Sequence, residues 1–173
     1  MADINKSFLE KILVQQKPLT AEEQRDPFFP ILIRLLSNLG SSISLEELDD
    51  ITTGKRLKWF AENYRRLELY KGLDPIEKAY RFIFLDHLHI KKGEIEVIHP
   101  NRNKIITRSH NWCPYLAACV RMGLNTRDIC KGMNENSFQA MATLIDPHLI
   151  FGRNYEKIRP YSAFCEEFIE YVP

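Results

Sequence analysis

Long hydrophobic runs and an excess of one charge are both missing from this sequence. No stretch approaches the roughly 18 apolar residues that a membrane-spanning helix needs, so a membrane partner is excluded. The N-terminus, Met1-Ala2-Asp3, does not begin an apolar segment with a small-residue cleavage site, and we expect no signal peptide and a cytoplasmic protein. The 24 basic residues nearly balance the 23 acidic residues, for a net charge of +1. This balance argues against nucleic acid as a partner, although it allows a local basic patch.

Cysteine is scarce and unevenly placed. The chain has 4 cysteines, all in its second half, at Cys113, Cys119, Cys130 and Cys165. A secreted disulfide scaffold would be shorter and denser in cysteine, so we expect free thiols. The sequence also lacks a glycine-rich phosphate loop, a Gly-x-Ser-x-Gly elbow, an HExxH motif and an EF-hand loop. What stays open is whether the thiols are buried and inert or chemically active.

Apolar residues at helical spacing dominate the first ninety residues. They predict a series of helices around residues 8–13, 31–39, 45–51, 57–67 and 76–84. Ser44 and Glu47 form a capping box before the third of these helices. Thr53-Gly54 is expected to break the chain, so that the third and fourth helices are separate.

The pattern changes near Gly93. Alternating side chains and turn residues predict a hairpin over 94–99 and 104–109 and further strands over 148–155 and 163–171. The sequence therefore predicts an α+β fold, with a small antiparallel sheet packed on helices in the C-terminal half. We divide the chain into a helical region, residues 1–90, and a cysteine-containing α+β region, residues 91–173, and expect them to form one compact unit.

The segment from His110 to Tyr115 carries the clearest signal for chemistry. Pro114 at the first helical position places Cys113 at the helix N-cap, where the dipole and free N–H groups favour a thiolate. His110 lies three residues earlier, and a cysteine with a nearby histidine is the minimum for covalent thiol catalysis. We predict that Cys113 has a lowered pKa and reacts fastest. The alternative is a cysteine that only caps a helix beside a surface histidine.

A metal site is a competing use of the same residue types. Cys113, Cys119, Cys165 and His148 are ligands suited to a divalent metal such as zinc. The gaps between them are irregular and no Cys-x-x-Cys knuckle is present. The ligands would therefore have to come from separate elements of the fold.

Two further clusters have a structural as well as a functional interpretation. We interpret His87 and His89 as a histidine pair favoured by the dipole at a helix C-terminus. Basic residues between Lys55 and Lys71 follow a capped helix and a turn, which is the outline of a DNA-reading module. We expect instead a solvated amphipathic helix with its basic side chains exposed and an inward face of Leu57, Phe60, Tyr64 and Leu67.

The C-terminal half also resembles a known family in the order of its features. These are Cys113-Pro114, then Cys119, Cys130, a helix with Phe138, Met141 and Ala142, the segment Asp146-Pro147-His148-Leu149-Ile150-Phe151-Gly152-Arg153, and Tyr161-x-x-x-Cys165. Over residues 110–171 this order resembles the L-2-amino-thiazoline-4-carboxylic acid hydrolase-like family.

The resemblance implies the hydrolytic opening of a small ring that contains sulfur and nitrogen. Cys113 and Cys165 would be reactive thiols that attack the C=N carbon of the ring, or that hold a metal whose bound water attacks. His110 would be the acid or base, and Arg153 and Tyr155 would bind the substrate, with Arg153 as a carboxylate clamp.

Two alternatives to a hydrolase stay open. One is a ligand- or metal-sensing protein, including a transcriptional regulator with an N-terminal helix-turn-helix-like module. The other is a non-catalytic interaction protein whose cysteines are core residues. In each case the expected partner is a small-molecule ligand or another protein, and a homodimer is an allowed assembly.

Overall fold

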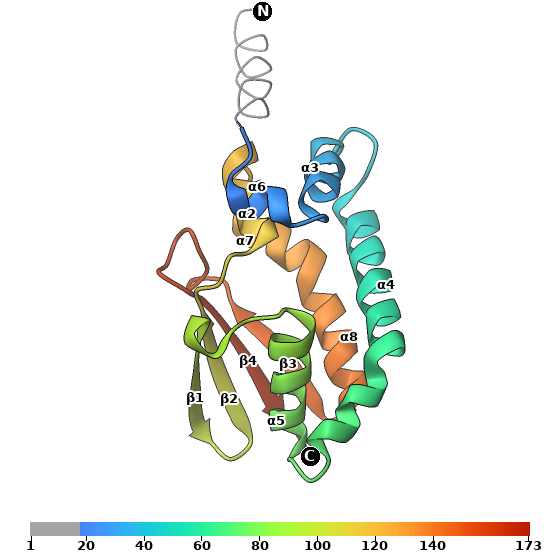
Figure 1. Ribbon diagram of the computed structural model, residues 1–173, viewed down its shortest axis with the longest axis vertical. Coiled ribbons are helices and arrows are strands. Elements are labelled where there is room, and N and C mark those ends of the chain that lie inside the picture. The colour runs from blue at the N-terminus through green and yellow to red at the C-terminus, as the bar shows by residue number, and fades with distance from the viewer. Residues whose placement is uncertain (1–17) are drawn as a thin grey trace, which may run out of the picture.

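The computed structural model describes residues 18–173, and the helix predicted around residues 8–13 lies outside the described residues. The N-terminal half is helical, and the C-terminal half holds a four-stranded antiparallel sheet packed on helices (Figure 1). The predicted α+β fold is therefore confirmed. In residues 18–173, no helix combines the length and the apolar character needed to cross a membrane.

The helical elements fall into two groups, before and after the β-hairpin. The first group is α2 (Ala21–Arg25), α3 (Phe29–Ser37), α4 (Leu45–Asn63), the 3-10 helix η1 (Tyr64–Tyr70), α5 (Pro75–Tyr80), the π-helix η2 (Arg81–His87) and the short η3 (Lys92–Glu94). The second group is α6 (Pro114–Met122), α7 (Thr126–Cys130), the π-helix η4 (Lys131–Glu135) and α8 (Asn136–Ile145).

The four predicted strands are all present. They are β1 (Ile95–Asn101), β2 (Lys104–Ser109), β3 (Leu149–Asn154) and β4 (Cys165–Tyr171), in the order β1-β2-β4-β3. Burial alternates along β2, as expected of a sheet with one face against helices. The last residue of β2, Ser109, lies opposite the first residue of β4, Cys165. This register brings the end of the hairpin to the beginning of the last strand.

Helix α4 corrects two sequence predictions. The helix runs without interruption through Thr53-Gly54, so the expected break is wrong and no turn separates two helices there. Its buried face repeats every fourth residue and packs on η4 and α8; it consists of Leu48, Thr52, Arg56 and Phe60. Packing along this whole face outweighs the cost of one glycine in a helix, about 1 kcal/mol. The helix-turn-helix outline that rested on the break is removed with it.

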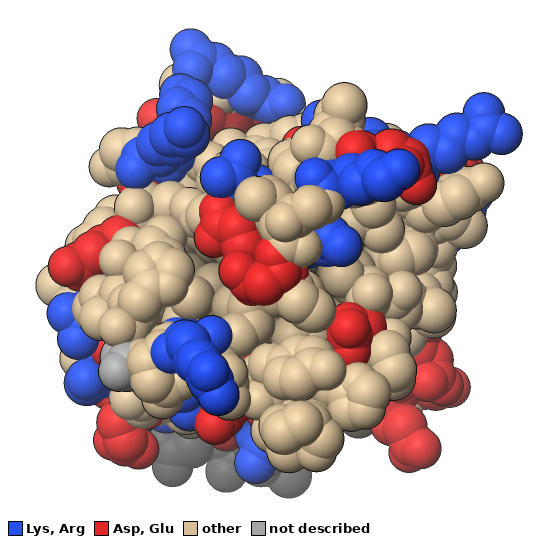
Figure 2. Space-filling model, turned by 90° about the horizontal axis from the view of Figure 1, so that it is seen from below, with Lys and Arg blue, Asp and Glu red and all other residues tan. Residues whose placement is uncertain are grey.

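The exposure of the basic segment also differs from the expectation. Arg56 is only 6% exposed, although we expected it in solvent, and Tyr64 is 52% exposed, although we expected it inside. Tyr64 begins η1, where the tighter 3-10 turn rotates the side chain away from the face that α4 buries. On the face shown in Figure 2, Lys and Arg side chains alternate with Asp and Glu and form no continuous basic surface.

Replacing Gly54 with alanine tests the continuity of α4. A Cβ atom at Gly54 would meet no atom within 4 Å, so Gly54→Ala is expected to raise the free energy of unfolding by about 0.5–1 kcal/mol. The matched control is Gly123→Ala, because Gly123 caps α6 at a φ of +65°, and there the change is expected to cost about 1 kcal/mol. Urea unfolding followed by circular dichroism measures both. A loss of stability in Gly54→Ala would contradict a continuous helix.

The apolar core has two parts, and residues packed in each of them line one cavity. The larger part joins helices of the first region to the sheet and α8, and includes Phe82, Ile105, Phe138 and Ile169. The smaller part lies between α3, α4, α6 and η4, and includes Phe29, Leu32, Leu48, Cys119 and Met133. Residues from both predicted regions therefore share the larger core.

Candidate functional site

A cavity of about 310 Å³ opens where several elements end. Ser109 ends β2, Cys165 begins β4, Cys113 precedes α6, and His87 ends η2, and all four line the cavity. Arg56 completes it from the middle of α4. A volume of this size suits a ligand with the dimensions of an amino-acid derivative.

Cys113 occupies the predicted position, but its predicted electrostatics are wrong. It is the N-cap of α6, with Pro114 opening the helix. Burial raises the pKa of the Cys113 thiol above its ordinary value, and the backbone N–H of Leu116 and the charge of Arg159 only partly oppose that rise. The helix N-terminus is therefore insufficient to make Cys113 an activated thiolate, because the low-polarity surroundings penalise the charged form more.

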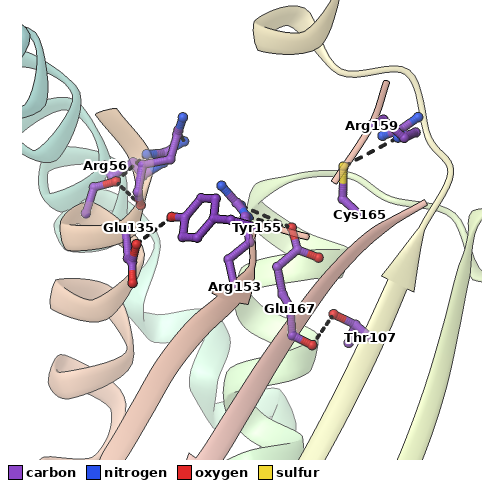
Figure 3. Close-up of polar contacts among 10 residues, drawn as sticks. Arg56, Thr107, Glu135, Arg153, Tyr155, Arg159, Cys165 and Glu167 are labelled. Carbon is purple, nitrogen blue, oxygen red and sulfur yellow. Dashed lines mark hydrogen bonds and ion pairs between the residues drawn. The ribbon is translucent and has the colours of Figure 1, made fainter. Parts of the chain in front are cut away.

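Cys165 lines the same cavity and has a direct cationic neighbour. Arg159 Nε donates a hydrogen bond to Cys165 Sγ at 3.5 Å (Figure 3). The Arg159 guanidinium is held in place because it also donates to the carbonyl oxygens of His110 and Asn111, at 3.1 and 2.8 Å. The two thiols that the family resemblance singles out are thus brought to one cavity, and Cys165 is the one next to a fixed positive charge.

The order of thiol reactivity follows from these surroundings. We expect iodoacetamide to label Cys165 faster than Cys113, and both faster than Cys119, whose pKa burial raises to about 11. Arg159→Met should slow the labelling of Cys165 most and leave that of Cys119 unchanged, because the guanidinium contacts Cys165 directly, and its charge otherwise acts on Cys113. Residue-resolved mass spectrometry over a pH series measures the rates. Faster labelling of Cys113 than of Cys165 would contradict this order.

Other predicted site residues lie outside the cavity lining. His110 is exposed, with its Nδ1 3.3 Å from the carbonyl oxygen of Ala163. Tyr155 donates its hydroxyl to Glu135 at 2.5 Å (Figure 3), and burial together with this bond raises the pKa of Tyr155. The imidazoles that do line the cavity are those of His87 and His89 rather than that of His110.

The four predicted metal ligands are not gathered by the fold. Cys119 is buried in the smaller apolar core, and His148 pairs with Asp146 beside the end of β4, at the opposite end of that strand from Cys165. Across residues 18–173, no group of three or more His, Cys, Asp or Glu side chains is placed to hold a metal ion. The residues therefore do not fit a zinc site of the predicted composition.

Arg153, the predicted carboxylate clamp, already holds a carboxylate of the protein. It lines the cavity from β3, and its Nη2 and Nε lie 3.0 and 3.2 Å from Oε1 of Glu167 on β4 (Figure 3). The side chains of this pair are only 8% and 7% exposed. The pair raises the pKa of Arg153, while burial raises the pKa of Glu167 against the opposing charge of Arg153. Glu167 therefore neutralises most of the charge of Arg153, and little of that charge is left to bind a ligand carboxylate.

Arg56 is the buried cation of the cavity that lacks such a counter-charge, whereas the half-buried Arg159 is engaged by Cys165 and two carbonyl oxygens. Its guanidinium donates to Ser137 Oγ and, at 2.6 Å, to Asn134 Oδ1, and it lies 4.0 Å from the centre of the Phe138 ring. Both hydrogen-bond acceptors are neutral, and no carboxylate within residues 18–173 forms an ion pair with Arg56 (Figure 3). Burial accordingly lowers the pKa of Arg56. A buried, fixed guanidinium beside a cavity is a site for an anion.

The sequence contained a signal for Arg56 that the expected helix break concealed. Leu48, Thr52, Arg56 and Phe60 follow one another at intervals of four residues. On a continuous helix this spacing places Arg56 on the buried face. Dividing the helix at Thr53-Gly54 removed half of that face and left Arg56 grouped with its exposed basic neighbours.

His87 corrects the interpretation of the histidine pair. Its ring packs against Trp59, with centroids 4.4 Å apart, and its Nδ1 is buried with no hydrogen-bond partner. Burial, with the nearby charge of Arg56, lowers the pKa of His87 from 6.5 to about 3. The imidazole is therefore neutral at physiological pH, and a dipole-stabilised imidazolium at this position is wrong.

This histidine should make stability fall in weak acid. His87 protonates with its ordinary pKa of 6.5 in the unfolded chain and resists protonation down to about pH 3 when folded. Its contribution is therefore complete above pH 6.5 and is lost as the pH falls towards 3. Between pH 7 and pH 5, wild type should lose about 2 kcal/mol more unfolding free energy than His87→Gln. Urea unfolding at both pH values measures this, and equal losses would contradict a neutral, buried His87.

Comparison of the chain with family models, curated proteins and solved structures finds no match.

Proposed function

We propose that this protein binds a small carboxylate-bearing ring compound in the cavity and opens the ring hydrolytically with its thiols. One observation carries the proposal: Cys113, Cys165 and the uncompensated Arg56 line a single cavity of about 310 Å³. The resemblance to the L-2-amino-thiazoline-4-carboxylic acid hydrolase-like family supports a ring that contains sulfur and nitrogen. Arg56, rather than Arg153, then receives the carboxylate.

The reaction that these groups support adds one water molecule to the ring. The sulfur of Cys165, as the thiolate, bonds to the C=N carbon, and the ring nitrogen takes up a proton. The bond between that carbon and the ring sulfur then breaks and releases the ring sulfur as a thiol. Water displaces the cysteine sulfur and restores the free enzyme.

A binding protein without turnover is the second candidate, and a specific observation favours it. Burial raises the pKa of Cys113, which disfavours the thiolate and makes that thiol a weaker nucleophile. A cavity with an anion site and a weakly nucleophilic Cys113 can hold a ligand and report its presence without changing it.

Turnover of 2-amino-thiazoline-4-carboxylate distinguishes the two candidates. Liquid chromatography with mass spectrometry should detect a product heavier by one water molecule. Cys165→Ser should lower the rate at least about 100-fold, because a serine hydroxyl is a far weaker nucleophile at neutral pH. Cys119→Ser is the control, since Cys119 lies outside the cavity, and it should retain the rate. Tight binding without product in wild type would assign the cavity to ligand sensing, and full activity in Cys165→Ser would contradict the thiol mechanism.

A further inference from the structure

The carboxylate of Glu167 has one oxygen that the protein leaves unused. Arg153 contacts Oε1 with two nitrogen atoms, whereas Oε2 is buried and has no hydrogen-bond partner. Glu167 also lines the cavity. A buried acceptor without a partner costs about 1–3 kcal/mol, more when it is charged. Such an atom is therefore rare in a folded protein unless a ligand or water satisfies it.

The position of Glu167 is fixed by the sheet as well as by the ion pair. Thr107, its partner across β2 and β4, donates its hydroxyl to the Glu167 carbonyl oxygen at 3.4 Å. Arg153 holds the carboxylate from β3 on the other side of β4. The free oxygen is thus a preorganised acceptor, and it cannot rotate towards solvent without breaking the contact with Arg153.

Arg56 and Glu167 offer opposite chemistry from different elements. Arg56 comes from α4 and Glu167 from β4. Figure 3 shows these two side chains on opposite sides of the drawn residues, with Arg153 and Tyr155 between them. The first presents N–H donors with positive charge and no carboxylate partner. The second presents a negatively polarised oxygen without a donor.

We propose that Oε2 of Glu167 is the subsite for a nitrogen-bound hydrogen of the ligand. This inference rests on the proposed function, which places the ligand carboxylate at Arg56. The cavity then selects molecules that carry an acid at one end and an N–H group, of the amino or amidine type, at the other. A ligand with only the carboxylate would leave the Glu167 oxygen buried and unsatisfied, so it would bind more weakly.

A pair of ligands tests this selection on one protein. The probes are 2-amino-thiazoline-4-carboxylate and 2-methyl-thiazoline-4-carboxylate, which share the ring and the acid but differ in the exocyclic N–H group. Isothermal titration calorimetry on the Cys165→Ser protein measures both affinities without turnover. The amino compound should bind about 10- to 100-fold more tightly than the methyl compound. This ratio corresponds to the free energy of one hydrogen bond to a charged group.

The assignment to Glu167 is tested by removing its charge. In Glu167→Gln the preference for the amino compound should fall to within about threefold, while the methyl compound binds nearly as before. Should Glu167→Gln fail to fold, the Arg153→Met/Glu167→Leu pair replaces both buried charges and serves the same comparison. Equal binding of the two probes to the parent would overturn this inference and leave the proposed function standing. A preference that survives in the folded Glu167 variant would overturn the residue assignment. Binding of neither probe would overturn the proposed function, and this inference with it.

Discussion

Replacing Arg153 with methionine is expected to lower the free energy of unfolding by about 3–5 kcal/mol, the largest stability effect that we predict. Arg153 and Glu167 are both more than nine-tenths buried and face each other at 3.0 Å. Without Arg153, the Glu167 carboxylate stays in the interior with neither oxygen paired, because Oε2 has no partner in wild type either. The penalty is the cost of an uncompensated buried charge rather than the strength of the pair.

The double variant separates these two quantities. Arg153→Met/Glu167→Leu removes both charges and fills the space with apolar atoms, so its stability should return to within about 2 kcal/mol of wild type. Lys58→Met is the surface control, since Lys58 and Glu62 form an exposed pair at 3.9 Å, and its effect should be below about 0.5 kcal/mol. Urea unfolding at pH 7 measures all three. A double variant as unstable as Arg153→Met would show that packing, rather than charge, dominates at this position.

Replacing Arg56 with methionine should have the largest effect on ligand binding and a small effect on stability. Removing the buried guanidinium relieves its desolvation, while the side-chain oxygen of Asn134 loses its donor at a cost of about 1–3 kcal/mol. These terms oppose each other, so the unfolding free energy should change by no more than about 2 kcal/mol. The affinity for 2-amino-thiazoline-4-carboxylate should fall at least about 30-fold, because the ligand carboxylate loses the buried guanidinium that receives it.

Arg56→Lys is the informative comparison for this variant. Lysine keeps the charge but lacks the planar fork that holds a carboxylate with two parallel hydrogen bonds. Its affinity should lie between those of wild type and Arg56→Met in calorimetric titrations. Unchanged affinity in Arg56→Met, with the fold intact, would remove Arg56 from the binding site.

The fold could be predicted further from the sequence than the site could. Period-two patterning and turn residues located all four strands, because both signals are local. The predicted helix break at Gly54 was wrong. Glycine lowers helix propensity only locally, whereas the length of α4 is determined by its contacts with η4 and α8, which are distant in sequence.

The candidate site depended on contacts that no local pattern records. The sequence identified Cys113, Cys165 and Arg153 as candidates, and all three line the cavity. It did not identify Glu167, which sits in the acidic run of β4 and resembles a solvent-facing residue. Its burial follows from Arg153, 14 residues away in sequence and on the neighbouring strand.

Protection of the thiols by ligand tests the central claim most directly. In wild type, saturating 2-amino-thiazoline-4-carboxylate should slow the iodoacetamide labelling of Cys113 and Cys165 and leave Cys119 unaffected, since the first two line the cavity and Cys119 does not. In Arg56→Met, the same protection of both thiols should need at least about 30-fold more ligand. Unchanged labelling of Cys113 and Cys165 in ligand-treated wild type, or protection of Arg56→Met by as little ligand as protects wild type, would contradict a single cavity that binds the acid at Arg56 and the ring at the thiols.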